Sequence, residues 1–295
     1  MKILVIGDIV VSCDLLVEAA KSLPGGEHEV VAVEWKSETR QEFQKKALNI
    51  EKNGPTAEEP PKEAYEQIGD ADILLSHFCP IPEDLIEAGK NLKIIARHGA
   101  GYDNLDWKAA NESGIYTTYS PDTTTLSVAE FTITVILNLA KRLKESEELV
   151  RNGDFQKKFS LKGTDVAGKT LGIIGFGKIG KEVARKAALG LDMRVISYVP
   201  RPEGKEIPGY VEIVSWEELL QTSDYISLHV PGGEKNQGII SKKEFAMMKK
   251  SASLIQVSRG DVVDEEALAE AIRNGQIRGA AVDVFSEEPP QKDNP

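Results

Sequence analysis

The sequence predicts an α/β protein made of two domains, each built around a parallel β-sheet. Apolar runs of strand length alternate with segments of helical spacing along most of the chain, and such alternation indicates a parallel sheet. The length of 295 residues suits about two domains. We therefore expect one domain over residues 1–120 and a second over residues 121–295.

In the first domain, an apolar run opens the chain and further strands and helices follow in alternation. We expect strands at 1–8, 29–35, 73–76 and 92–97, and helices at 13–23 and 82–89. The polar stretch 36–66 contains three prolines and predicts a surface helix and loop. The first strand ends without closely spaced glycines, so it is not expected to bind a nucleotide.

A long apolar pattern over residues 127–150 predicts one helix at the junction of the domains. It is either a core helix that joins them or a hinge that also forms a dimer face. Because its apolar surface exceeds what one core needs, we expect a homodimer.

In the second domain, strands and helices alternate again. We expect strands at 170–174, 194–198, 225–230, 254–257 and 279–284, and helices at 182–189, 215–220, 242–248 and 265–274.

The glycines at the first of these strand–helix junctions form a dinucleotide-binding pattern. Gly175 would make the tight turn, Gly177 would let the backbone approach a pyrophosphate, and Gly180 would let the helix pack on the strand. The free N–H groups of the helix would face the phosphates. The pattern predicts a flavodoxin-like or Rossmann-like fold that binds NAD or NADP through Gly175, Phe176, Gly177, Lys178, Ile179 and Gly180.

The charge balance argues against large anionic partners. The chain has 36 Lys and Arg against 47 Asp and Glu, a formal net charge of −11, which disfavours nucleic acid and anionic membranes. Cys13 and Cys79 do not suggest a disulfide framework, and neither a signal sequence nor an apolar run of spanning length is visible. We expect a cytoplasmic protein without a metal site.

Three further motifs follow the later strands: 227–231 (SLHVP), 257–261 (VSRGD) and 283–289 (DVFSEEP). With the glycine pattern, their order resembles the D-specific 2-hydroxyacid dehydrogenase family. Segments 97–104 and 127–130 resemble its substrate loop and the start of its interdomain helix. The resemblance implies an oxidoreductase that transfers a hydride between NAD(P)H and a small anionic 2-keto or 2-hydroxy acid, of the glyoxylate, hydroxypyruvate or phosphoglycerate type, in an interdomain cleft.

The chemistry needs a cation for the substrate carboxylate and carbonyl, and Arg259 suits that task unless it forms only a surface salt bridge. The resemblance implies that Glu288 holds a catalytic histidine, although Glu287 and Glu288 could be solvated turn acids. It also implies that Asp283 contacts the nicotinamide carboxamide, unless it only caps a turn. Further implied contacts are Ala100, Gly101 and His77 for the substrate, and His229, Val230, Pro231, Val257 and Ser258 for the cofactor.

One departure from the family concerns the proton donor. The family's catalytic histidine follows the last motif in a Pro-His-x-Gly segment, whereas this sequence stops at Pro295. We expect such a segment to follow, and residues 1–295 alone to bind nucleotide but reduce 2-keto acids slowly. Otherwise His77 or His98 would replace the acid; both can also be ordinary loop histidines.

The second departure lies after the strand 194–198. Val199 stands where an NAD-specific fold usually has an acid, and Arg201 follows. NADP is therefore favoured over NAD, unless Arg201 simply faces solvent. The alternative function is a nucleotide-binding regulatory module, similar to the family's corepressor branch, that performs no turnover.

Overall fold

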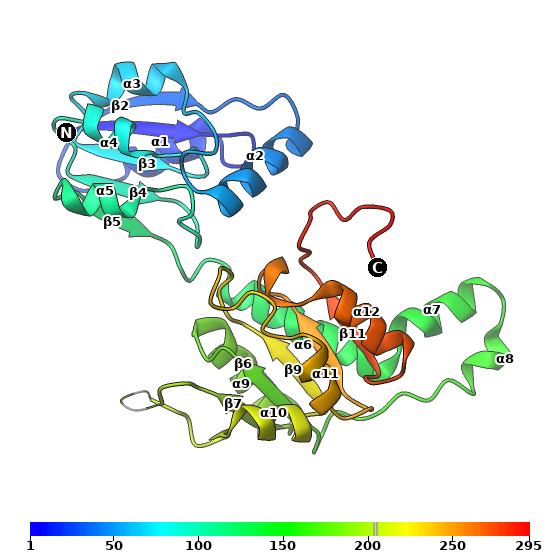
Figure 1. The fold of residues 1–295 in the computed structure, drawn as a ribbon. Coiled ribbons are helices and arrows are strands. Elements are labelled where there is room, and N and C mark those ends of the chain that lie inside the picture. Colours follow the sequence, from blue (N-terminus) through cyan, green and yellow to red (C-terminus); the bar gives the residue numbers. More distant parts are fainter. Residues whose placement is uncertain (203, 205) are drawn as a thin grey trace. The chain divides into compact units, whose positions relative to one another are not determined.

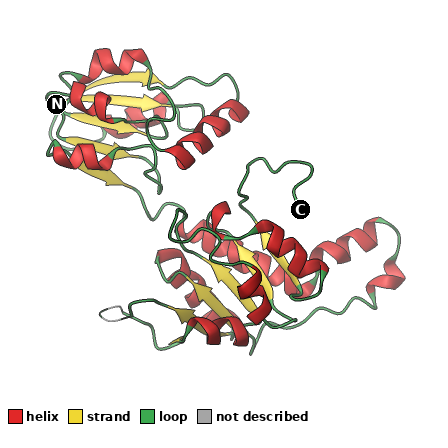
Figure 2. Cartoon of the chain, viewed as in Figure 1, coloured by secondary structure: helices red, strands yellow, loops and turns green. Residues whose placement is uncertain are grey.

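The computed structural model describes residues 1–202, 204 and 206–295. The chain separates into two compact units, Met1–Thr123 and Thr124–Pro295 (Figure 1). Each is an α/β unit in which helices pack against one parallel sheet (Figure 2). The two-domain α/β class predicted from the sequence is thus confirmed.

The first unit has a five-stranded parallel sheet in the order β2-β1-β3-β4-β5. Its strands are β1 (Lys2–Gly7), β2 (Glu29–Glu34), β3 (Ile73–Ser76), β4 (Ile94–Arg97) and β5 (Tyr116–Tyr119). Its helices are α1 (Cys13–Lys21), α2 (Arg40–Asn53), α3 (Lys62–Ile68), α4 (Glu83–Ala88) and α5 (Trp107–Glu112).

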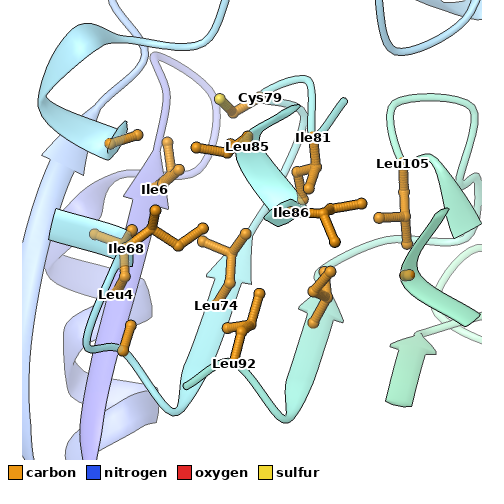
Figure 3. Close-up of a cluster of buried hydrophobic side chains, with 14 of the residues drawn as sticks. Leu4, Ile6, Ile68, Leu74, Cys79, Ile81, Leu85, Ile86, Leu92 and Leu105 are labelled. Atoms are coloured by element: carbon orange, nitrogen blue, oxygen red, sulfur yellow. The ribbon is translucent and has the colours of Figure 1, made fainter. Parts of the chain in front are cut away.

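Side chains of β1 alternate between the two faces of this sheet, as the period of a strand requires. Leu4 and Ile6 join one buried cluster, part of which is drawn in Figure 3, while Ile3 and Val5 join another. Both faces are therefore covered, which explains why the opening strand is apolar at consecutive positions.

The second unit has a six-stranded parallel sheet in the order β11-β10-β9-β6-β7-β8. Its strands are β6 (Thr170–Ile174), β7 (Arg194–Tyr198), β8 (Val211–Ile213), β9 (Tyr225–Leu228), β10 (Ser253–Gln256) and β11 (Gly279–Val282). Its helices are α6 (Thr125–Lys141), α7 (Leu143–Arg151), α8 (Phe155–Lys158), α9 (Lys178–Leu191), α10 (Trp216–Thr222), α11 (Lys242–Met247) and α12 (Glu265–Arg273), with a 3₁₀ turn at Gly260–Val262.

The strand orders identify where ligands can bind. Counted within each unit, they are 2-1-3-4-5 and 3-2-1-4-5-6, the orders of flavodoxin-like and dinucleotide-binding folds. The winding direction reverses between β1 and β3 in the first unit and between β6 and β9 in the second. Ligands bind such sheets at the carboxyl ends of the strands beside the reversal.

The prediction of a single helix over residues 127–150 is wrong. The structure has α6 and α7 instead, separated by Arg142 in the left-handed conformation with φ of 54°. That conformation breaks the i to i−4 hydrogen-bond pattern, so one helix ends at this residue and another begins after it. The apolar pattern of the sequence nevertheless continues across the break. Among the described residues, no helix is long and apolar enough to cross a membrane.

Candidate active site

The glycine pattern forms the turn between β6 and α9, and two of its glycines are required by close packing. Gly175 has φ of 100°, and a Cβ there would lie 2.5 Å from the carbonyl carbon and oxygen of His229. A Cβ at Gly180 would collide with the carbonyl oxygen of Gly175. These glycines let the helix and the end of β9 approach the turn.

Gly177 differs because a Cβ there would meet nothing within 4 Å. It is the N-cap of α9 and makes no side-chain capping bond. By the geometry of an α-helix, the first N–H groups of this 14-residue helix point out of its N-terminal end, where Gly177 leaves room for a close approach. This arrangement fits the pyrophosphate of a dinucleotide, which would be bound by backbone N–H groups and the positive end of the helix.

Beside this turn, His229 begins the segment that follows β9, with Val230 and Pro231 after it. Its backbone N–H donates to the carbonyl of Ile174 at 2.7 Å, and its Nε2 lies 2.9 Å from the Ser227 hydroxyl oxygen. Burial lowers the pKa of His229 to about 4. The imidazole is consequently neutral at pH 7 and adds no charge beside the turn.

Next along the sheet, Val257, Ser258 and Arg259 follow β10. The buried side chain of Gln256 fixes this loop: its Nε2 donates to the Arg259 carbonyl at 2.7 Å and its Oε1 accepts from the Ser258 hydroxyl at 2.8 Å. Arg259 is exposed in an extended conformation, and its Nη1 donates to the Ser258 carbonyl at 3.0 Å. The guanidinium keeps further N–H donors available for an anion.

A hydrogen bond and close backbone packing connect the loops that follow β9, β10 and β11. Asp261 accepts from the backbone N–H of Gly233 at 2.6 Å. A Cβ at Gly232 would lie 3.1 Å from Cβ and Cγ of Arg259, and one at Gly260 would collide with the Phe285 carbonyl. The position of Arg259 thus depends on the loops at either side.

After β11, Asp283 is exposed and its backbone N–H donates to the Gln256 carbonyl at 2.9 Å. Glu288 folds back, and its Oε1 accepts from the Phe285 N–H at 2.9 Å. The one histidine of this unit, His229, has Ser227 as its partner rather than Glu288. Glu288 therefore shapes its own loop in the described structure.

After β7, on the other side of β6, the side chain of Val199 is buried in the core and Arg201 is exposed. All six positions predicted from the glycine pattern lie in the turn between β6 and α9 or in the first turn of α9. Phe176 is 9% exposed, and Lys181 lies over its ring at 6.0 Å from the ring centroid. The parallel sheet brings the turn to the same edge as Arg259 and Asp283.

In the first unit, His77 follows β3 and is held by a buried carboxylate. Its Nδ1 lies 2.7 Å from Oδ2 of Asp8, which follows β1. The His77 ring is stacked on Phe43, with ring centroids 6.4 Å apart.

The adjacent β4 leads into the loop that carries Ala100 and Gly101. Arg97 is buried, and its Nη1 donates to the His98 carbonyl at 3.0 Å. Gly99 has φ of 132°, and a Cβ there would collide with the Arg97 guanidinium. Burial, together with the charges of His77 and Arg97, lowers the pKa of His98.

Sequence reasoning missed Asp8, Gln256 and Asp261 as residues that fix the site. Asp8 and Gln256 are polar residues at or just after the end of a buried strand, and Asp261 lies within the motif 257–261; these positions were the available signal. Their partners could not be read from the sequence, since Asp8 and His77 are 69 residues apart.

Comparisons with known proteins agree with this geometry. Residues 133–295 match the family model described as "D-isomer specific 2-hydroxyacid dehydrogenase, NAD binding domain". The chain is 40% identical over 245 residues to hydroxypyruvate reductase of Thermotoga maritima, covering 82% of this chain and 79% of that protein. It is 40% identical over 237 residues to D-3-phosphoglycerate dehydrogenase of Methanocaldococcus jannaschii, covering 79% of this chain but only 45% of that protein.

Solved structures show the same likeness. A glyoxylate reductase from Paecilomyes thermophila aligns with a TM-score of 0.75 and 30% identity, covering 100% of this chain and 84% of that one. D-lactate dehydrogenase from Lactobacillus jensenii, solved with NAD⁺, aligns with a TM-score of 0.74 and 27% identity, covering 98% and 80%. The comparisons give no support to the regulatory alternative. The chain belongs to the D-isomer-specific 2-hydroxyacid dehydrogenase family, whose members are oxidoreductases.

Proposed function

We propose that the protein transfers a hydride between a nicotinamide dinucleotide and a small 2-keto or 2-hydroxy acid. The observation that carries the proposal is the common sheet edge in the second unit, which holds both the Gly175 turn and the extended Arg259 loop. The turn suits a pyrophosphate and the guanidinium suits a carboxylate. When bound, the nucleotide supplies or accepts the hydride.

The residues of this edge have separate roles in the proposal. Arg259 binds the substrate carboxylate and polarises the carbonyl, and Gln256 fixes its backbone. Asp283 contacts the nicotinamide amide, and Val257, Ser258, Val230 and Pro231 contact the cofactor. Glu288 would serve as the carboxylate partner of a catalytic histidine.

In this proposal, a domain over residues 1–120 supplies the substrate loop, and a domain over residues 121–295 binds the nucleotide. The backbone N–H groups of Ala100 and Gly101 bind the substrate carboxylate. Arg97 supports this loop, because it donates a hydrogen bond to the His98 carbonyl. Its guanidinium fills the space that a side chain at Gly99 would need.

The preferred cofactor is NADPH. An acid at Val199 would repel a 2′-phosphate, and the valine does not. Arg201 is exposed two residues later and can pair with that phosphate.

We also propose a cytoplasmic homodimer. The segment α7–α8 has no buried residue, yet it exposes Leu143, Val150, Phe155 and Phe159. On α6, Leu126 and Phe131 are exposed as well. A second copy of the chain would cover this apolar surface.

The test is reduction of glyoxylate and hydroxypyruvate, followed by NADPH and NADH absorbance. We expect Arg259→Gln to lower kcat/KM by about 10²–10³-fold, because it removes the charge that stabilises the developing alkoxide. Nucleotide affinity, measured by fluorescence titration, should stay unchanged. Equal kcat/KM in the variant would contradict the role of Arg259, and a wild-type protein that reduces no 2-keto acid would contradict the function.

A further inference from the structure

The proposed function does not yet assign a role to the hydrogen bond between Asp8 and His77 in the first unit. The two residues follow β1 and β3, the neighbouring strands at which the winding of the sheet reverses. The Asp8 side chain has no exposed surface, and its Oδ2 lies 2.7 Å from Nδ1 of His77. The pair lies on the sheet edge that also carries the loop with Ala100 and Gly101, since β4 is next to β3.

Asp8 fixes which ring nitrogen of His77 carries a proton. Its Oδ1 accepts from the backbone N–H groups of Val10 and Val11, both at 2.9 Å, and its Oδ2 also accepts from the N–H of Phe78 at 3.2 Å. Burial alone would raise the pKa of Asp8, but the hydrogen bonds from His77 and the backbone outweigh it and lower this pKa. An ionised carboxylate is only an acceptor, so Nδ1 of His77 must be the donor.

The other ring nitrogen, Nε2, is therefore a hydrogen-bond acceptor in the neutral imidazole. The His77 side chain keeps 15% of its surface exposed. Within the part of the chain that the structure describes, Nε2 has no hydrogen-bond partner, and it is not among the buried atoms without one. An accessible acceptor of fixed orientation is available for a ligand.

The surroundings of this acceptor are aromatic. Phe43 stacks on the His77 ring with an interplanar angle of 10°, and the edges of Phe78 and His98 approach it with centroids at 5.7 and 5.8 Å. Arg97 is the nearby cation, and its guanidinium lies over the Phe78 ring. The ring of His77 can thus move little without breaking its bond to Asp8.

We propose that His77 selects 2-keto acids that carry a hydroxyl group next to the carbonyl, with Asp8 as its positioning residue. The inference rests on the proposed function. The hydroxymethyl group of hydroxypyruvate offers an O–H donor to Nε2. The methyl group of pyruvate lacks the hydroxyl oxygen and its donor, and glyoxylate has only a hydrogen atom there. A site with an acceptor fixed in this way favours the substrate that satisfies it.

The experiment compares hydroxypyruvate with pyruvate in the wild type and in His77→Asn. The asparagine amide can still donate to Asp8 from near the position of Nδ1, but it has no atom at Nε2. We expect kcat/KM for hydroxypyruvate to fall roughly three- to tenfold more than kcat/KM for pyruvate, through KM, because one neutral hydrogen bond is lost with hydroxypyruvate alone. His28→Asn, the same substitution in a turn of the same unit, is the matched control and should change neither.

A second measurement does not depend on turnover. The ¹⁵N resonances of His77 in the unliganded protein should show a protonated Nδ1 and an unprotonated Nε2 at pH 8.5, and Asp8→Asn should reverse this preference and abolish the selectivity. Selectivity that is unchanged in His77→Asn, or a protonated Nε2 in the wild type, overturns the inference and leaves the proposed function standing. A wild type that reduces glyoxylate but neither of these two substrates overturns the inference alone, and one that reduces no 2-keto acid overturns the proposed function with it.

Discussion

Single polar side chains at strand ends determine how the candidate site is arranged. Gln256 ends a fully buried strand, and its side chain donates to the Arg259 carbonyl while its own carbonyl accepts from the N–H of Asp283. In the first unit, the Asp8 carboxylate holds the side chain of His77 through a hydrogen bond. The type of chemistry was predictable from the neighbouring motifs, but these partners were not, because their contacts form only once distant strands pair.

Arg201 should decide the choice between cofactors. A charge-assisted bond to the 2′-phosphate is worth roughly 1.5–3 kcal/mol, so NADPH should bind about ten- to a hundredfold more tightly than NADH. Arg201→Ala should remove most of this preference, as measured by fluorescence titration with both nucleotides. Tighter binding of NADH by the wild type, or unchanged selectivity in the variant, would refute the proposal.

His229 should make the stability of the second unit depend on pH. Its pKa of about 4 in the folded protein lies below the ordinary value of 6.5, so the unfolded chain binds more protons between these values. The stabilising contribution is present above pH 6.5 and is lost as pH falls toward 4. We expect the free energy of unfolding to drop by about 2 kcal/mol between pH 7 and pH 5 through this group.

Urea unfolding of the wild type and of His229→Gln at the two pH values measures the effect. The variant should lose this part of the pH dependence, while His28→Gln should keep it. If the free energy of unfolding changes equally with pH in the wild type and in His229→Gln, burial does not lower the pKa of His229.

At the scale of elements, two glycines of the β6–α9 junction have different roles. We expect Gly175 to be needed for stability and Gly177 for nucleotide binding. Gly175→Ala should destabilise the protein by about 2 kcal/mol or more, because φ is positive and the new Cβ would press on the His229 carbonyl. Gly177→Ala should leave thermal stability nearly unchanged, since its φ is −83° and the space is open, but it should weaken nucleotide binding. Melting curves and fluorescence titrations on both variants test this, and equal destabilisation by the two would contradict it.

The elements that the sequence predicted are those with a strong apolar pattern, such as β6 and β9, whose residues are all buried. Weakly patterned elements were not predicted. All four residues of β5 are exposed, and β8 has only three residues, so neither shows the pattern of a buried strand. The break at Arg142 could not be predicted either, because arginine is a good helix former and its left-handed conformation depends on packing around it.

At the scale of the whole molecule, assembly is the main prediction. We expect a dimer in sedimentation velocity at micromolar concentration, because α7 and α8 leave Leu143 57% and Phe159 74% exposed. The double variant Leu143→Glu, Phe159→Glu should sediment as a monomer, while Lys144→Glu, a charge change on the same helix, should not. A monomeric wild type would contradict the proposal, and retained nucleotide binding in the double variant would show that its second unit is folded.

The close packing of the loops that follow β9, β10 and β11 limits how this protein can be changed by directed evolution. At Gly232 and Gly260 a single added methyl group meets a neighbouring loop, so one change there requires compensating changes in another loop at the same time. Random libraries at these positions should return mainly unfolded clones. Arg201, which is exposed after β7, lacks this restriction, which makes it the productive position to randomise for a new cofactor.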